Sequence, residues 1–445
     1  MSKRIYYGEF NAEKYWREEN LAKLPEIPDK QSENIVKAMD ELLFILCDKE
    51  DAVLTRYKLD DDQLEYLKEL GLEFKYNSTS LTEDKSKEEK NKNICELLIT
   101  NDNSEIKELL SEETHLETFA VLPEAYKLSN LYHKHFDYPT IDVIKKVNSK
   151  MYSSKLNLEL DINNKIKLIY SSKELYEEGM KYLSKGSIII KDSFGVSGKG
   201  NLIISNESIL KRIVSYVDMQ EKKGKRVEFI LEPLLEKSKD FSCQFKIHKD
   251  GSFEIISVQE VRNTGLSYLG SYTPDKEFME FIKKQSYFEI MEKTAKRLYE
   301  DGYYGDVCID SMILKDRSIC PVVEINARKS MSLIKHELDN YAHNLGLKCG
   351  FTFLNVSFNN NIDYSEILKV LSKNNILFKP SFNKGIMPLS SNTIFINRQL
   401  DTNKTLNNYK GRFYFAILYK DMDIVEELTN SLISSLKEIG INSSN

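Results

Sequence analysis

Two acidic residues stand in strand-like stretches that are otherwise apolar, and they raise the possibility of metal-dependent chemistry. Asp310 lies in residues 307–314, and Glu324 lies in residues 321–328. If a turn over residues 315–317 pairs these stretches, both carboxylates can point to one face, because side chains alternate along a strand. A buried carboxylate is costly without a partner. The pair therefore predicts either a bound cation or ion pairs with lysines.

Asn326 and Arg328 follow Glu324 at steps of two residues, so the three side chains share a face if the segment is a strand. Two carboxylates and an amide oxygen are hard ligands that suit Mg²⁺ shared with nucleotide phosphates. We predict Asp310, Glu324 and Asn326 as ligands of two Mg²⁺ ions. Arg328 is predicted as a catalytic cation for phosphoryl or acyl-phosphate oxygens.

A glycine-rich segment, residues 191–201, lies between two strand-like stretches. Its candidate phosphate-binding residues are Lys191, Gly195, Ser197, Gly198 and Gly200. Glycines allow positive φ and a close approach of the backbone to a ligand. The segment is neither a P-loop nor a Rossmann fingerprint, since no Gly-Lys-Ser/Thr closes it and a strand follows. It predicts either an ordinary hairpin or a flap over phosphates, with the ammonium of Lys191 in reach.

Together, the glycine-rich segment and the acidic strands resemble the ATP-grasp superfamily over residues 148–334. The resemblance implies an α/β fold in which ATP lies between a flap and a second lobe. Lys150 and Lys191 match its phosphate-binding lysines, and Arg328 and the three metal ligands match its metal-binding strands. The segment with Glu232, Leu234 and Leu235 looks like the hinge that holds adenine, and Asp240 lies near the usual ribose contact.

The resemblance also implies a division into parts. We expect a pre-ATP-grasp α/β domain at residues 1–145, a flap subdomain at 146–230, a nucleotide and metal lobe at 231–348 and a small α/β module at 349–445. This organisation is similar to that of peptide ligases and carrier-protein aminoacyl ligases. The bicarbonate- and biotin-specific surround of biotin-carboxylase-type enzymes is not recognisable.

The function implied is a two-step ligation with ATP and Mg²⁺. A carboxylate becomes an acyl-phosphate, and an amine then attacks it to form an amide or peptide bond, with amino acids or peptides as substrates. One alternative acceptor is the thiol of an acyl or peptidyl carrier protein. An alternative of another class is a non-catalytic nucleotide-binding protein. The absence of Lys191 or of the predicted metal ligands from the sequence would favour it, but these residues are all present.

Arg262, in residues 259–265, belongs to the lobe expected to face the acyl group. It is predicted either to bind a carboxylate there as a catalytic residue or to be a surface arginine. Lys329 and Ser330 follow the metal strand, and they are either acceptor-site or ordinary loop residues.

Composition narrows the remaining classes. The 445 residues allow about three domains, and 41% hydrophobic with 30% charged residues is typical of a globular chain. The net charge of −6 gives no support to nucleic-acid binding. No apolar stretch has the length of a signal peptide or a membrane span, so we expect a cytoplasmic protein without a membrane partner. The six cysteines form no CxxC pair and are expected as free thiols. The sequence does not decide whether the protein forms a homo-oligomer.

Periodicity predicts the elements around these residues. Strands are expected at 187–191, 200–205, 227–232, 241–248 and 252–260, and helices at 94–110, 173–183, 209–222 and 277–301. Residues 42–46 fit a strand or a helix. Residues 77–93 are polar and are expected to form a mobile loop that buries no apolar surface.

Overall fold

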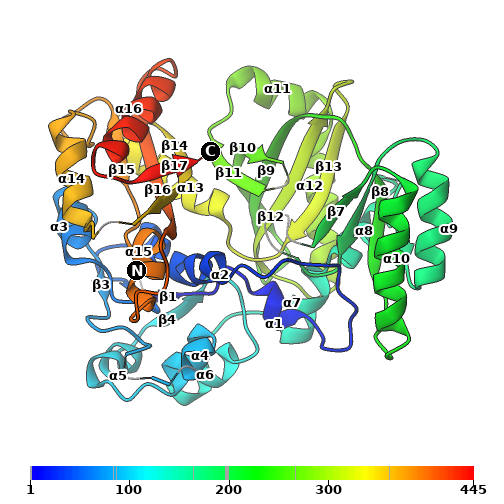
Figure 1. Ribbon diagram of the computed structural model, residues 1–445, viewed down its shortest axis with the longest axis horizontal. Coiled ribbons are helices and arrows are strands. Elements are labelled where there is room, and N and C mark those ends of the chain that lie inside the picture. Colours follow the sequence, from blue (N-terminus) through cyan, green and yellow to red (C-terminus); the bar gives the residue numbers. More distant parts are fainter. Residues whose placement is uncertain are drawn as a thin grey trace.

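The structure is a computed structural model. It describes residues 3–83, 85–86, 88–163, 165–195, 200–265, 267–359 and 361–444. Three sheets organise these described residues (Figure 1). A parallel sheet near the N-terminus and a large sheet share one continuous hydrophobic core, whereas the flap sheet has a core of its own. In the described part of the chain, no helix has the length and apolarity needed to cross a bilayer.

The N-terminal sheet has the order β3 (Lys75–Tyr76), β2 (Ala52–Val53), β1 (Arg4–Tyr7) and β4 (His115–Thr118), with every pair parallel. The same part of the chain contains α1 (Glu13–Trp16), α2 (Lys30–Lys37), η1 (Ala38–Leu46), α3 (Asp61–Glu69), η2 (Glu89–Asn91), α4 (Ile94–Ile99), α5 (Ser104–Ser111) and α6 (Ala125–Leu131). The carboxyl ends of its strands all meet at one edge, as in other parallel sheets.

Two details of this region differ from the sequence predictions. Residues 94–110 form two helices, because the Asn103 side chain accepts bonds from the backbone of Glu105 and Ile106 and so begins a new helix. Within 77–93, the expectation of a loop that buries nothing apolar is wrong at Leu81, which is buried and whose N–H donates to Arg56 O at 3.0 Å. Residues 84 and 87 of that segment lie outside the described residues.

The flap sheet is antiparallel, in the order β5 (Lys167–Ile169), β8 (Phe229–Pro233), β6 (Ile188–Asp192) and β7 (Asn201–Ile204). Helices α9 (Ser172–Leu183) and α10 (Glu207–Glu221) pack beside it, at the right of Figure 1. Apolar side chains from the sheet and from both helices, among them Ile188, Ile190, Leu175 and Leu210, form the separate core of the flap.

The large sheet has the order β13 (Ile319–Asn326), β12 (Gly305–Leu314), β9 (Lys237–Ile247), β10 (Phe253–Thr264), β11 (Ser267–Tyr272), β14 (Lys348–Phe358), β16 (Tyr409–Tyr419) and β15 (Gly385–Pro388), and β17 (Asn442–Ser444) also pairs with β14. The accompanying helices are α7 (Ile141–Val147), α8 (Lys150–Glu159), α11 (Lys276–Lys284), α12 (Tyr287–Glu300), α13 (Met331–Asn344), α14 (Tyr364–Lys373), α15 (Asn392–Leu400) and α16 (Ile424–Glu438). The sheet therefore continues across the predicted boundary at residue 348, because β11 pairs with β14.

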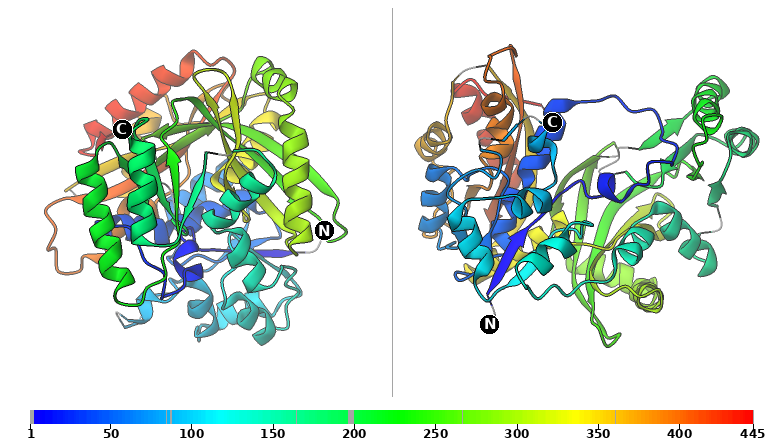
Figure 2. Two further views of the ribbon diagram at one scale, coloured as in Figure 1. Left: turned by 90° about the vertical axis from the view of Figure 1, so that its right-hand side faces the viewer. Right: turned by 90° about the horizontal axis from the view of Figure 1, so that it is seen from below.

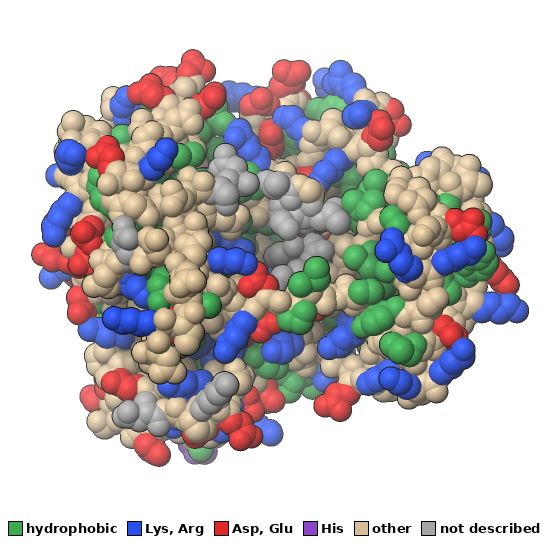
Figure 3. All heavy atoms as spheres, in the orientation of Figure 1, with side chains coloured by type: hydrophobic (Ala, Val, Ile, Leu, Met, Phe, Trp, Pro, Cys, Tyr) green, Lys and Arg blue, Asp and Glu red, His purple; other side chains and the backbone are tan. Residues whose placement is uncertain are grey.

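The predicted helix at 277–301 is two helices, since Ser286 has a left-handed backbone (φ 54°) between α11 and α12. Residues 42–46 belong to the 3₁₀ helix η1, which settles the choice between strand and helix. On the face shown in Figure 3, basic and acidic side chains are interspersed.

Candidate nucleotide and metal site

The two predicted metal-binding strands are antiparallel neighbours. Asp310 of β12 lies directly opposite Glu324 of β13, and Cys308 lies opposite Asn326. Residues paired in this way share a face of the sheet. The Nδ2 of Asn326 donates to Oδ2 of Asp310 at 3.0 Å. The structure thus brings the three predicted ligands together.

The carboxylate pair is electrostatically strained. Burial raises the pKa of Asp310 to about 7, and the negative charge of Glu324 adds to this rise. The guanidinium of Arg328 and the hydrogen bond from Asn326 act in the opposite direction. A cation between the two carboxylates would relieve their repulsion.

The donor set fits Mg²⁺ shared with phosphates. In the part of the chain that the structure describes, no three His, Cys, Asp or Glu side chains gather into a metal site of their own, so the remaining ligands would come from an amide and from a substrate. Asn326 directs its amide nitrogen to Asp310 and accepts a bond from Arg328 at its oxygen, 3.2 Å away.

Lys150 joins this acidic pair to the glycine-rich segment. It is the first residue of α8, which begins after the capping Ser149. Its Nζ donates to Oε1 of Glu324 at 2.7 Å and to the carbonyl oxygen of Gly195 at 2.6 Å. Its backbone N–H donates to Ser193 O at 2.9 Å. One ammonium therefore touches both halves of the predicted site.

Lys191 lies at the end of β6 and forms a second cation at the site. Its Nζ is 2.7 Å from Oε2 of Glu232, and both side chains are largely buried. Burial alone would lower the pKa of Lys191, but the Glu232 carboxylate outweighs it and raises that pKa. Leu234, after the end of β8, is exposed, while Leu235 is half-buried; the hinge role of this segment stays a prediction.

The base of the glycine-rich segment has a defined geometry. Gly200 has a φ of 81°, and a Cβ on it would lie 3.1 Å from Cβ of Asp192, so a side chain would be strained there. The N–H of Asp192 donates to Gly200 O at 2.8 Å. Ser197 and Gly198 lie outside the described residues.

Arg328 has a partner that the sequence did not suggest. Its Nε and Nη2 donate to Oε1 of Glu13 at 3.1 and 2.8 Å. Burial opposes the charge, but Glu13 raises the pKa of Arg328 overall. No motif surrounds Glu13, and its separation from Arg328 by 315 residues left no sequence signal.

Asp240 lies close to the acidic pair. It stands opposite Met312 in the register of β9 and β12, and its charge contributes to the raised pKa of Asp310. Its Oδ2 accepts bonds from Lys237 at 2.5 Å and from Asn263 at 2.7 Å. The ribose contact predicted for Asp240 stays a prediction.

Arg262 is not brought to this site. Gln259 pairs with Ser242, which pairs with Asp310, so these three share a face. Arg262, three residues beyond Gln259, points to the opposite face, where its guanidinium carbon lies 4.0 Å from the ring centroid of Tyr272. This position favours the alternative of a surface arginine, and the contact with the acyl group stays a prediction.

Lys329 and Ser330 both have partners within the protein, and the choice between an acceptor-site role and an ordinary loop role stays open. The Nζ of Lys329 is 2.9 Å from Glu117 Oε2 and 2.7 Å from Asp306 Oδ2, which joins β4 to β12. Ser330 caps α13 by accepting from Leu333 N.

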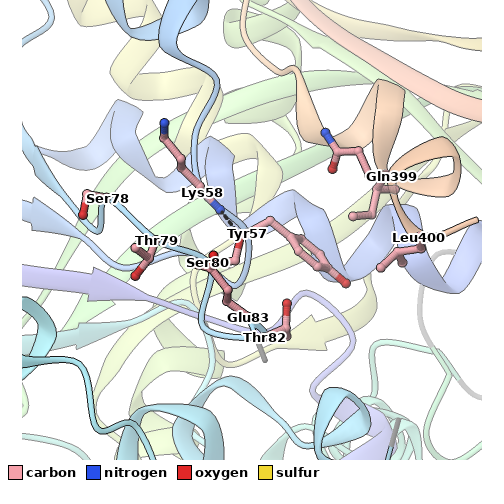
Figure 4. A pocket seen from close by; sticks show the side chains of 10 residues that line it. Tyr57, Lys58, Ser78, Thr79, Ser80, Thr82, Glu83, Gln399 and Leu400 are labelled. Atoms are coloured by element: carbon pink, nitrogen blue, oxygen red, sulfur yellow. Dashed lines mark hydrogen bonds between the residues drawn. The ribbon is translucent and has the colours of Figure 1, made fainter. Parts of the chain in front are cut away.

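A cavity of about 390 Å³ lies apart from these residues (Figure 4). Its lining comes from the N-terminal region and α15, namely Tyr57, Lys58, Ser78, Thr79, Ser80, Thr82, Glu83, Ile396, Gln399 and Leu400. Among the predicted site residues that the structure describes, none lines this cavity.

Comparison with known proteins finds a distant relative of this chain. No family model matches the chain. It is 23% identical over 313 residues to the [butirosin acyl-carrier protein]--L-glutamate ligase of Niallia circulans, with 68% of this chain and 67% of that protein covered.

Solved structures share the fold over nearly the whole chain. A biotin carboxylase from Campylobacter jejuni has a TM-score of 0.55 at 11% identity, covering 100% of this chain and 93% of that chain. An N5-carboxyaminoimidazole ribonucleotide synthetase in complex with ADP has a TM-score of 0.52 at 12% identity, covering 98% and 96%. The biotin carboxylase domain of Hydrogenobacter thermophilus 2-oxoglutarate carboxylase, with MgADP and bicarbonate, has a TM-score of 0.53 at 13% identity, covering 100% and 91%. The predicted fold is confirmed.

Proposed function

We propose that this chain is an ADP-forming ligase of the ATP-grasp superfamily, and that it joins a carboxylate to an amine through an acyl-phosphate. The observation that carries the proposal is the position of Lys150. Its ammonium bonds both Glu324 of the acidic pair and the Gly195 carbonyl of the glycine-rich segment. The two predicted halves of a triphosphate site therefore meet at one charged group.

In the first step, an oxygen of the substrate carboxylate attacks the γ-phosphorus of ATP in line. The bond from that phosphorus to the bridging oxygen breaks, and ADP leaves. Lys150, Lys191 and Arg328 are each held by a carboxylate, at Glu324, Glu232 and Glu13 respectively. These cations can stabilise the negative charge that spreads over the phosphoryl oxygens.

Asp310, Glu324 and Asn326 would hold Mg²⁺, which neutralises phosphate charge when it is bound. Two carboxylates are enough to share one or two ions with the phosphates. Lys150 must then release Glu324 and turn to the nucleotide, a change that its long side chain permits.

In the second step, the amine nitrogen attacks the acyl carbon, inorganic phosphate leaves, and the nitrogen loses a proton. The product is an amide, and we propose an amino acid or a peptide as substrate. The protein acts by placing the reactants and stabilising charge, so a nucleophilic side chain is unnecessary.

A second candidate is the ligation of an amino acid to a carrier protein through a thiol. The relative from Niallia circulans supports it, because its name gives an acyl-carrier protein and L-glutamate as the joined partners. The two candidates differ in the acceptor atom, nitrogen or sulfur, and in the stability of the product to hydroxylamine.

The test is an ADP-release screen with Mg-ATP. Amino acids, singly and in pairs, and carrier proteins with and without L-glutamate serve as substrates, and mass spectrometry identifies the products. Release of ADP with an amide product supports the first candidate, and a hydroxylamine-sensitive carrier adduct supports the second. Absence of Mg-ATP binding by calorimetry would reject both and favour a different role.

A further inference from the structure

The segment between β1 and α2, residues 8–29, leaves the N-terminal region, reaches the flap and returns (Figure 2). We call it the strap. Its first half is fixed to the N-terminal region, where the ring of Phe10 stacks on Phe119 at a centroid distance of 3.9 Å. The indole N–H of Trp16 donates to Val121 O at 2.7 Å.

The second half of the strap belongs to the flap. Ala22 N donates to Arg226 O at 2.9 Å, and Arg226 N donates to Asn20 O at 2.8 Å. Ala22 and Leu24 are buried in the hydrophobic core of the flap. A segment from outside the flap therefore completes its core, and the flap cannot move away from the N-terminal region without moving the strap.

Between these anchors, Arg17 meets the base of the glycine-rich segment. Its guanidinium forms a two-pronged ion pair with Asp192, with Nη2 3.1 Å from Oδ2. Nη1 of Arg17 also lies 3.3 Å from the carbonyl oxygen of Phe194. Leu24 N adds a bond to the same carboxylate, at 3.3 Å. Both charged side chains are nearly buried, at 9% and 5% exposure, so neither can exchange its partner for water cheaply.

Asp192 directly follows Lys191 and holds the far end of the glycine-rich segment through Gly200. Four residues before Arg17, Glu13 holds Arg328 of the metal strand. One short stretch of the strap thus contacts Arg328, the cation of the metal strand, and Asp192, the neighbour of the flap cation Lys191.

We propose that the strap sets the distance between the flap and the metal strands, with Arg17 as a positioning residue for Lys191 and Glu13 as a positioning residue for Arg328. The inference rests on the proposed function. Without Arg17, Asp192 is a buried carboxylate that lacks its cation, so the end of β6 must shift or become hydrated. Lys191 shifts with it.

The test compares Arg17→Ala and Arg17→Lys with Lys23→Ala, which removes the same charge from an exposed site on the strap. The measurements are the Kd of Mg-ATP by calorimetry and hydrogen exchange over residues 188–195. We expect Arg17→Ala to weaken Mg-ATP binding by about tenfold and to speed exchange in this stretch, with partial recovery in Arg17→Lys, because a charge-assisted pair is lost and partly restored. Lys23→Ala should match the unaltered protein.

Asp192→Asn keeps the shape of the pair and removes its negative charge, so it replaces Arg17→Ala in the test if that variant fails to fold. It should weaken Mg-ATP binding in the same way. Normal affinity and normal exchange in the Arg17 and Asp192 variants would overturn the inference while leaving the proposed function intact. If the unaltered protein itself does not bind Mg-ATP, the proposed function fails, and the exchange data still decide whether Arg17 holds the end of β6.

Glu13→Gln separates the two positioning roles. It should lower kcat by about fivefold while the Kd of Mg-ATP stays unchanged, because Arg328 acts on charge that develops during the reaction. An unchanged kcat would limit Glu13 to a structural contact.

Discussion

The acidic strands and the flap reach the candidate site by different routes. Asp310 and Glu324 are opposed by the register of β12 and β13, two strands joined by a short turn inside a large sheet. Lys191 stands on a separate sheet with a separate core. Residues from outside that sheet connect it to the rest of the site. Lys150 of α8 bonds both Glu324 and the Gly195 carbonyl, and Arg17 of the strap pairs with Asp192.

Substitutions in the two halves should therefore have different effects. The acidic half is fixed by hydrogen bonds between neighbouring strands, so a change of its side chains should alter chemistry with the fold intact. The flap half is placed by a few ion pairs and by the strap, so changes there should first alter nucleotide affinity.

The largest effect is expected at the acidic half. Glu324→Gln should lower turnover by at least about a hundredfold, since it removes charge from the proposed metal site and leaves the shape. ADP release measures the rate, and thermal unfolding checks that the fold is intact. Glu300→Gln, on the exposed end of α12, is the matched control. A near-normal rate in Glu324→Gln would remove the acidic strands from the mechanism.

On the flap side, Lys191→Ala should reduce turnover by about a hundredfold and also weaken Mg-ATP binding, because the ammonium is proposed to contact phosphate in both the ground and transition states. Steady-state ADP release and calorimetry separate the two effects. Lys181→Ala, exposed on α9 of the same flap, should change neither. If Lys191→Ala altered only thermal stability, the ion pair with Glu232 would be purely structural.

A moderate effect is expected from pH. The pKa of Asp310 is raised to about 7 by burial and by Glu324, and a metal ion binds the ionised carboxylate. Mg-ATP affinity should therefore be full above pH 7 and fall below it, by up to about tenfold per pH unit, with a proton released on binding near pH 7. Calorimetry in two buffers of different ionisation enthalpy measures that proton. A flat profile from pH 6 to 8 would place the metal elsewhere.

The smallest effect is expected at Arg262, which lies on the other face of β10 and stacks on Tyr272. Arg262→Ala should change kcat/KM by less than about threefold, as is usual for a residue outside the reacting groups. A loss of a hundredfold would show that the substrate reaches this face as well.

The sequence by itself was enough to predict that Asp310, Glu324 and Asn326 lie on one face of two paired strands. The step of two residues from Glu324 to Asn326 and the short turn before Ile319 fix which side chains share a face, because a strand alternates over nearest neighbours. The ATP-grasp fold followed from the order of these motifs along the chain. Lys150, Lys191 and the glycine-rich segment were also identified from the order of the motifs in the sequence.

Tertiary structure alone decided the rest. Which face of the sheet Arg262 occupies depends on the register of β9, β10 and β12. The residues next to Arg262 in the chain do not determine that register. Glu13 and Arg17 have no motif around them, and their partners Arg328 and Asp192 are 315 and 175 residues away. A sequence encodes periodicity among neighbours, whereas such contacts exist only after packed cores have placed distant segments side by side.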